Sequence, residues 1–252
     1  MKKPLVFISH ITQEAEMATE VKTLIEQNFL GMIEVFVSSD GNSIKMGQKW
    51  LDSISEALGH CAIEIVICIP LSVQRPWINF EAGAGWVRGI PVIPLCHSGM
   101  EPSKLPVPLN LLQAAKLTDL NALKLVFPVF ANALGASSPK IDFTDFIKKI
   151  NDFEERYTFW TKCNEAFAEL EKIQPEITID LKKNTRVGMG LTETEINCLK
   201  PHIKFLSVNM IIQAESYGET QLTNTGLYYT WVLTPLSKFS DTVNHAKFNI
   251  NH

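Results

Sequence analysis

Short apolar runs alternate with segments of helical spacing over the first half of the chain, and this alternation constrains the fold most strongly. The runs cover residues 4–10, 33–37, 62–69 and 91–95. The run 62–69 is apolar almost throughout, which is typical of a strand covered on both faces. Strands that alternate with helices at this spacing predict an α/β fold with a parallel, doubly wound sheet.

Helix signals lie between these runs. Thr12 is expected to cap the first helix, and Pro76 suits the first turn of a third helix over 77–88. Gly83 and Gly85 fall inside that third helix, where each costs about 1 kcal/mol relative to alanine. One interpretation is that close packing or a contact with another protomer requires these glycines. The other is that the helix ends early, and the sequence favours neither.

The second half of the chain changes character after the stretch 135–139, which is rich in turn-forming residues. A long helix is predicted over 143–173, followed by a strand over 176–181, a helix over 191–206 and a strand over 228–233. The predicted organisation is an N-terminal domain over 1–135, a helical linker over 136–175 and a small α+β accessory domain over 176–252.

The stretch 225–236 resembles the final hairpin and helix start of a winged-helix module. The alternative is an accessory cap specific to this protein, which we favour slightly. Residues 176–252 hold 7 Lys and Arg against 7 Asp and Glu, a net charge of zero. A duplex reader needs excess positive charge, so nucleic acid is not an expected partner. A protein or ligand trigger at this domain fits better.

Composition excludes several classes of protein. The 252 residues are 46% hydrophobic and 20% charged, so the chain can bury a core and is not disordered as a whole. The longest apolar runs are too short for a membrane span or a signal peptide. Five scattered cysteines, an odd number, indicate reduced thiols in the cytoplasm. No CxxC or HExxH motif occurs and the six histidines are scattered, so no metal site is predicted.

Trp77 and Glu81 are the strongest candidates for chemistry. They are four residues apart near the start of the third predicted helix, so they share one helix face. Ligands of parallel sheets bind at the carboxyl ends of strands. An aromatic platform beside a carboxylate suits a substrate with a flat ring and a sugar. The alternative is that Trp77 belongs to the core and Glu81 is a solvated acid. Trp50 and Trp86 are expected in the core.

Several short motifs in this order resemble the Toll/interleukin-1 receptor (TIR) domain, especially its prokaryotic branch. The resemblance covers residues 1 to about 135. The motifs are Phe7–His10 at the first strand, Glu34–Asp40 at the second, Ile44, Gly47 and Trp50 after it, then Trp77 with Glu81, and Val92–Leu95 at the fourth strand.

The resemblance implies a flavodoxin-like, five-stranded parallel sheet with helices on both faces. It also implies an activity, since many members hydrolyse or cyclise NAD⁺ and release nicotinamide. NAD⁺ would then be the substrate, with no further cofactor. The catalytic glutamate of the family corresponds to Glu81, and Trp77 would stack on a base. The implied substrate-binding residues are Trp77, Asp40, Ser9, His10, Ile11 and Thr12. The chain lacks the arginines that some members carry after the first strand, which leaves backbone N–H groups as the phosphate donors.

The stretch 41–47 resembles a family loop that often completes the active site of a neighbouring protomer. Ile44, Met46 and Gly47 are its candidate assembly residues, which implies a homo-oligomer with activity switched on by assembly or a partner, in a setting of prokaryotic immunity. Two other functions stay open: a non-enzymatic adaptor that signals through homotypic contacts, and a sensor that binds a nucleotide without cleaving it.

Overall fold

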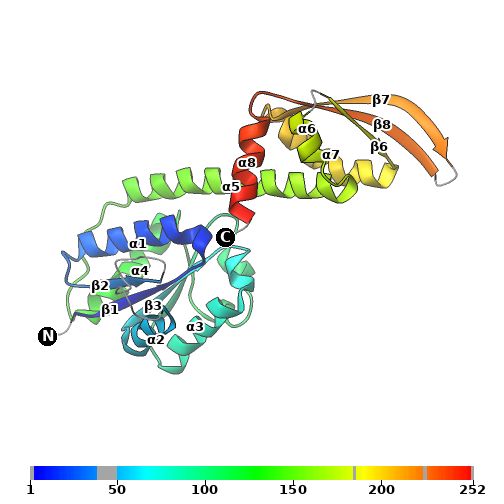
Figure 1. Cartoon of the computed structure of the whole chain (residues 1–252). Coiled ribbons are helices and arrows are strands. Elements are labelled where there is room, and N and C mark those ends of the chain that lie inside the picture. Colours follow the sequence, from blue (N-terminus) through cyan, green and yellow to red (C-terminus); the bar gives the residue numbers. More distant parts are fainter. Residues whose placement is uncertain (1–2, 39–49, 184–185, 224–225, 251–252) are drawn as a thin grey trace. The chain divides into compact units, whose positions relative to one another are not determined.

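The computed structural model describes residues 3–38, 50–183, 186–223 and 226–250 (Figure 1). The chain divides into two compact units, Met1–Glu155 and Arg156–His252. The predicted site residues Asp40, Ile44, Met46 and Gly47 lie outside the described residues.

The first unit is built on a parallel sheet of five strands. They are β1 (Leu5–Ser9), β2 (Glu34–Val37), β3 (Ile63–Cys68), β4 (Val92–Cys96) and β5 (Ala115–Lys116). The strand order is β2-β1-β3-β4-β5, and every neighbouring pair is parallel. Side chains of the central strand β3 are buried throughout, as its apolar sequence predicts. The predicted flavodoxin-like fold is therefore confirmed.

Helices cover both faces of this sheet (Figure 1). They are α1 (Ala15–Asn28), α2 (Trp50–His60), α3 (Pro76–Val87) and α4 (Leu120–Ala133). Helices α1 and α4 pack on the face that carries Ile65 and Leu95. On the opposite face, α2 packs against Phe7, and α3 packs against Val66 and Cys68. The residues that follow β1, β3 and β4 meet at the carboxyl edge of the sheet.

Two local predictions in this unit are wrong. Thr12 does not cap α1, because it begins a single 3₁₀ turn, Thr12–Glu14, that precedes the helix. The Glu14 carboxylate instead accepts the backbone N–H of Ile11. Trp86 does not lie in the core, because its side chain is about half exposed on α3. Only one side of this helix packs on the sheet, and position 86 falls away from that side.

The second unit has an antiparallel sheet of three strands. The elements are α5 (Thr144–Ile173), α6 (Ile177–Lys183), β6 (Val187–Leu191), α7 (Glu193–Val208), β7 (Ile212–Thr223), β8 (Gly226–Pro235) and α8 (Phe239–Ile250). The strand order is β6-β8-β7. The boundary between the two units falls within α5, the helix that covers most of the predicted linker over 136–175.

The predicted helix over 191–206 and the strand over 228–233 are confirmed as α7 and β8. The strand predicted over 176–181 is wrong, because this stretch begins α6. Its buried side chains, Ile177, Thr178 and Leu181, follow helical rather than alternating spacing. A single helix, α7, connects β6 to β7, where a winged-helix module would place two. No helix among the described residues is long and apolar enough to cross a membrane.

Candidate active site

Glu81 lies on the buried side of α3, at the carboxyl edge of the sheet. Its side chain is 1% exposed. The hydroxyl of Ser9, the last residue of β1, donates a hydrogen bond of 2.6 Å to Glu81 Oε2. The indole Nε1 of Trp77 donates one of 2.7 Å to Glu81 Oε1. Each carboxylate oxygen therefore has a donor, and three of the predicted site residues lie together.

Two opposing effects act on the pKa of Glu81. Burial raises the pKa of Glu81 to about 7, while the hydrogen bonds from Ser9 and Trp77 lower it. Burial disfavours the charged carboxylate, and the donors favour it. Perturbed carboxyl groups of this kind gather at functional sites. Near neutral pH, Glu81 is thus poised between its charged and neutral forms.

Trp77 makes two contacts within helix α3. Its ring stacks on Phe80, with 5.3 Å between the ring centroids, and its indole N–H holds Glu81. The side chain is 37% exposed, so it is not a core residue. It lies at the surface beside the buried carboxylate and can offer its ring to a ligand.

The predicted binding residues after β1 lie in different surroundings. His10 is buried, its Nδ1 lies 3.4 Å from the carbonyl oxygen of Ile8, and burial lowers its pKa. The N–H of Ile11 donates to Glu14, so this backbone group is not free to bind a phosphate. The side chain of Thr12 is exposed. Of the predicted residues at the end of β1 and just after it, Ser9 is the one whose hydrogen bond to Glu81 is seen among the described residues.

A second group of buried polar residues lies at the same edge of the sheet. Glu14, Ser72 and His97 are all completely buried. The Ser72 hydroxyl donates to Glu14 Oε1 over 3.1 Å, and His97 Nε2 lies 3.5 Å from the same oxygen. These three side chains come from the segments after β1, β3 and β4 and connect them. This group was not predicted from the sequence, where its signal is a polar residue soon after each of three apolar runs.

Glu64 is a further buried acid, and it was not predicted from the sequence as a site residue. It lies in the central strand β3, paired with Phe7 of β1 and Val92 of β4, and is 0% exposed. Burial, followed by the charge of Glu81, raises the pKa of Glu64 to about 8. The available signal was a single acidic residue inside the otherwise apolar run 62–69.

The two glycines of α3 differ in their surroundings. A Cβ atom on Gly85 would lie 2.1 Å from Glu64 Oε2 and 2.8 Å from Val92 Cγ2. A Cβ on Gly83 would meet no atom within 4 Å. The helix runs on through both to Val87, so it does not end early. Close packing explains Gly85, where the missing side chain leaves room for the Glu64 carboxyl group.

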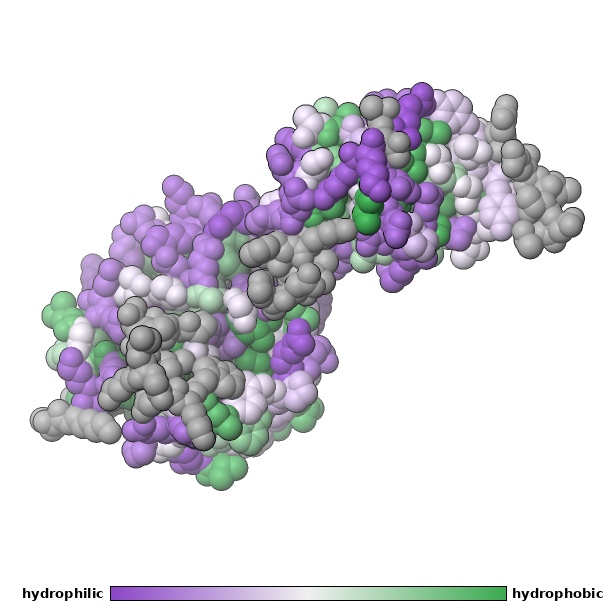
Figure 2. Space-filling model, in the orientation of Figure 1, coloured by the Kyte–Doolittle hydropathy of each residue, from purple (hydrophilic) through white to green (hydrophobic). Residues whose placement is uncertain are grey.

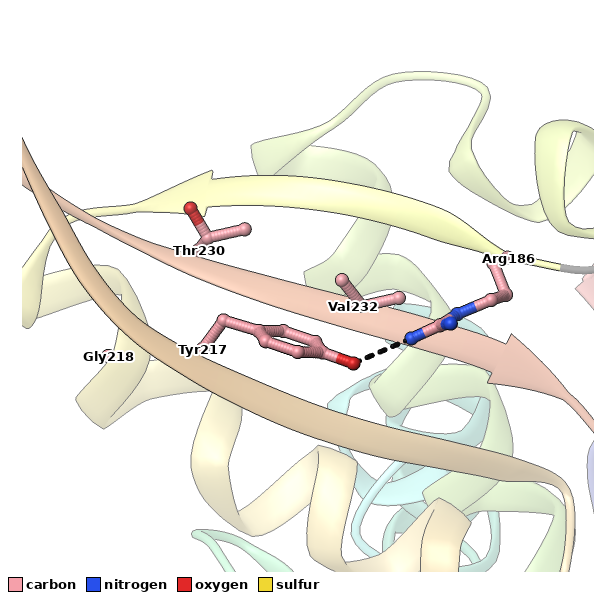
Figure 3. Close-up of a pocket in the computed structure, with 5 residues that line it drawn as sticks. All are labelled: Arg186, Tyr217, Gly218, Thr230 and Val232. Atoms are coloured by element: carbon pink, nitrogen blue, oxygen red, sulfur yellow. Dashed lines mark hydrogen bonds between the residues drawn. The ribbon is translucent and has the colours of Figure 1, made fainter.

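A separate open depression lies on the sheet of the second unit (Figure 3). It is lined by Arg186, Tyr217, Gly218, Thr230 and Val232. Arg186 and Tyr217 point toward one another, and the guanidinium donates to the tyrosine hydroxyl over 2.8 Å. Both groups also bind the Glu215 carboxylate. Because these polar groups already satisfy each other, the depression is a weaker candidate site than Glu81.

No group of three or more His, Cys, Asp or Glu side chains that could hold a metal ion occurs in the part of the chain that the structure describes.

Comparisons with known proteins identify the first unit. Residues 6–127 match the family model described as "TIR domain". The first unit has a doubly wound α/β fold, and Glu81 lies at the carboxyl edge of its sheet. The match identifies this domain as a TIR domain. No curated protein matches the chain.

Two solved structures are similar to the chain. One is the TIR domain of the Toll-related receptor TRR-2 from Hydra magnipapillata, with 21% identity and a TM-score of 0.36, covering 52% of this chain and 94% of that one. The other is the TIR domains of the activated Roq1 resistosome that directly recognises the pathogen effector XopQ. It has 17% identity and a TM-score of 0.33, and it covers 62% of this chain and 82% of that one.

Proposed function

We propose that the TIR domain of this chain cleaves the bond between nicotinamide and ribose in NAD⁺, with Glu81 as the catalytic residue. The observation that carries the proposal is the Glu81 carboxylate, which two donors hold at the carboxyl edge of a parallel sheet. Nucleotide ligands bind at this edge in doubly wound folds. The family resemblance of the first unit supports the choice of NAD⁺.

The chemistry needs one fixed negative charge. The C1′–N bond breaks, and its electron pair leaves with nicotinamide, which departs as a neutral molecule. Positive charge develops on the ribose, and the Glu81 carboxylate stabilises this oxocarbenium ion. Water then adds to C1′ and releases a proton, which gives ADP-ribose. If a base of the dinucleotide attacks C1′ in place of water, the product is cyclic.

Trp77 can take part both in binding the substrate and in hydrogen bonding to Glu81. Its indole N–H donates a hydrogen bond to Glu81 Oε1. We propose that the half-exposed indole moves to stack on a base of the dinucleotide and frees this oxygen for the ribose hydroxyls. The Ser9 hydroxyl, on the other oxygen, keeps the carboxylate in place.

The direct test is nicotinamide release from NAD⁺ by purified protein. We expect Glu81→Gln to lower the rate by about 10²–10³, as loss of one charge-stabilising group does in other enzymes. Glu56→Gln is the matched control, because it makes the same change on an exposed surface of α2 and should leave the rate unchanged. Wild-type turnover by folded Glu81→Gln protein would remove Glu81 from the mechanism.

Self-association is a second candidate function, which exposed apolar residues favour. Leu51 of α2 and Phe80, Trp86 and Val87 of α3 are all exposed, and Val87 is 91% exposed. Hydrophobic side chains show among hydrophilic ones along the lower edge of the first unit, where α2 and α3 lie (Figure 2). Exposed apolar clusters of this kind mark interaction surfaces. We propose that this surface contacts a second copy of the chain, whether as part of the enzyme or as an adaptor.

Light scattering over a range of protein concentrations tests this second proposal. We expect Val87→Lys to reduce self-association, and Val208→Lys, at an exposed position of α7, serves as the control. If assembly also completes the active site, specific activity should rise with protein concentration by mass action. Ile44→Asp tests the loop that the sequence implicates. A wild-type protein that stays monomeric at constant specific activity would contradict the proposal.

A further inference from the structure

The Glu64 carboxyl group is buried without a hydrogen-bond partner. Neither of its oxygens has a partner among the described residues, and the side chain is 0% exposed. It projects from the centre of the sheet toward α3, where the bare Cα of Gly85 leaves room for it. An ionised carboxylate in such a place is strongly disfavoured unless it is paired and hydrogen-bonded. Geometry alone therefore favours the neutral, protonated form of Glu64.

The charged groups around Glu64 do not reverse this preference. Its strand partners, Phe7 and Val92, carry no charge. Helix α3 contributes Glu81, whose negative charge opposes ionisation of Glu64. Arg88, the residue directly after this helix, carries a positive charge that favours ionisation. The Arg88 guanidinium, however, donates to the carbonyl oxygens of Leu58 and Cys61 and to the Cys61 thiol. The Cys61 thiol is itself held neutral, because burial raises its pKa.

We propose that Glu64 is a positioning residue that holds one proton beneath α3 while Glu81 is ionised, and that loss of this proton ends the pH range in which Glu81 works. Glu81 ionises first, because a side-chain donor holds each of its oxygens. Neither oxygen of Glu64 has such a partner, and only the nearby backbone N–H of Gly85 and the charge of Arg88 favour its ionised form. Glu64 must then ionise against the charge of Glu81 as well as against its own burial. The two buried glutamates thus share a single negative charge near neutral pH, and that charge lies on the residue at the edge of the sheet.

Loss of the second proton has a structural consequence. Both buried carboxylates would then be charged, on β3 and on the α3 helix that packs against it. Repulsion between them pushes α3 away from β3, and Gly85, which packs on the Glu64 carboxyl, is the point of closest approach. Helix α3 carries both Glu81 and Trp77, so the candidate site loses its geometry.

Titration of the carboxyl groups tests the inference without any assay of activity. Glutamate labelled with ¹³C at the side-chain carboxyl carbon is followed by NMR against pH in the full chain. We expect one carboxyl group to titrate at about pH 7 and another at about pH 8. Glu64→Gln should remove the higher midpoint, and Glu81→Gln should lower it, because the like charge is gone. A Glu64 midpoint near the ordinary 4.5, or one that Glu81→Gln leaves unchanged, overturns the inference.

The pH profile of nicotinamide release tests the consequence for function, and this arm rests on the proposed function. We expect a bell-shaped profile for the wild-type chain, with limbs at about 7 and about 8. Glu64→Gln should keep the acid limb and lose the alkaline one, whereas the control Glu56→Gln should keep both.

The carboxyl titration and the pH profile distinguish a failure of the proposed function from a failure of the proposed role of Glu64. Absence of nicotinamide release from the wild-type chain at every pH refutes the proposed function, while the carboxyl titration still decides the role of Glu64. An active wild type whose profile Glu64→Gln leaves unchanged refutes the role of Glu64 and leaves the function standing. Should Glu64→Gln fail to fold, the Glu81→Gln titration of Glu64 remains decisive.

Discussion

Replacement of the two glycines of α3 by alanine should have opposite effects on stability. Alanine is favoured over glycine inside a helix by about 1 kcal/mol. At Gly83 an added Cβ meets no atom within 4 Å, so Gly83→Ala should raise the free energy of unfolding by about this amount. At Gly85 the same atom would lie 2.1 Å from Glu64 Oε2 and 2.8 Å from Val92 Cγ2.

Overpacking of a buried contact costs about 1–3 kcal/mol. After the gain in helix propensity, Gly85→Ala should change the free energy of unfolding by roughly 0 to −2 kcal/mol. The two variants should therefore differ by roughly 1–3 kcal/mol, although both place one methyl group on the same helix. The difference arises from the Glu64 carboxyl group and from Val92, which a sheet strand holds in place.

Hydrogen exchange of peptides from β1 and β3, measured by mass spectrometry, reports the opening of the first unit without interference from the second. Truncation of the obstructing side chain by Glu64→Ala should reduce the cost of Gly85→Ala, which a double-mutant cycle would reveal. Equal protection in the two glycine variants, or a cost that Glu64→Ala leaves unchanged, would refute this account of the packing.

Three other outcomes follow from the buried carboxyl groups. Ser9→Ala should move the acid limb of nicotinamide release to higher pH, because the lost hydrogen bond lowers the pKa of Glu81 in the wild type. Trp77→Phe should shift this limb in the same direction and keep some stacking, whereas Trp77→Ala should also raise KM for NAD⁺. Equal KM values for the two Trp77 variants would argue against stacking. The free energy of unfolding should fall as pH rises from about 4.5 to 8, because the unfolded chain releases protons that folded Glu64 retains. Glu64→Gln should remove at most about 5 kcal/mol of this dependence in urea titrations at several pH values, and an unchanged slope would contradict a protonated Glu64.

The order and type of most elements in the first unit could be read from the sequence. Runs such as 62–69 are too apolar to be exposed and too short for a buried helix, so a buried strand is the remaining option. The spacing of Trp77 and Glu81 also placed them on one helix face, which the structure confirms. These features depend on local periodicity, which a sequence displays directly.

Local patterns were less decisive where segments are short or irregular. The stretch 176–181 contains too few residues to separate a strand from a helix, and packing against the core of the second unit decides for α6. Strand β6 was missed because Gly188 and Gly190 occupy its exposed positions, where polar side chains would have revealed the alternation.

The sequence alone determined that Glu81 follows a buried strand on a helix beside Trp77. Only the tertiary structure decided the chemical state of that carboxyl group. Ser9, 72 residues away, reaches Glu81 because β1 lies next to β3 in the sheet. Glu64 lies beneath α3 because Gly85 allows the helix to approach the strand. Burial, hydrogen bonds and neighbouring charges set a pKa, and each depends on side chains that only folding brings together.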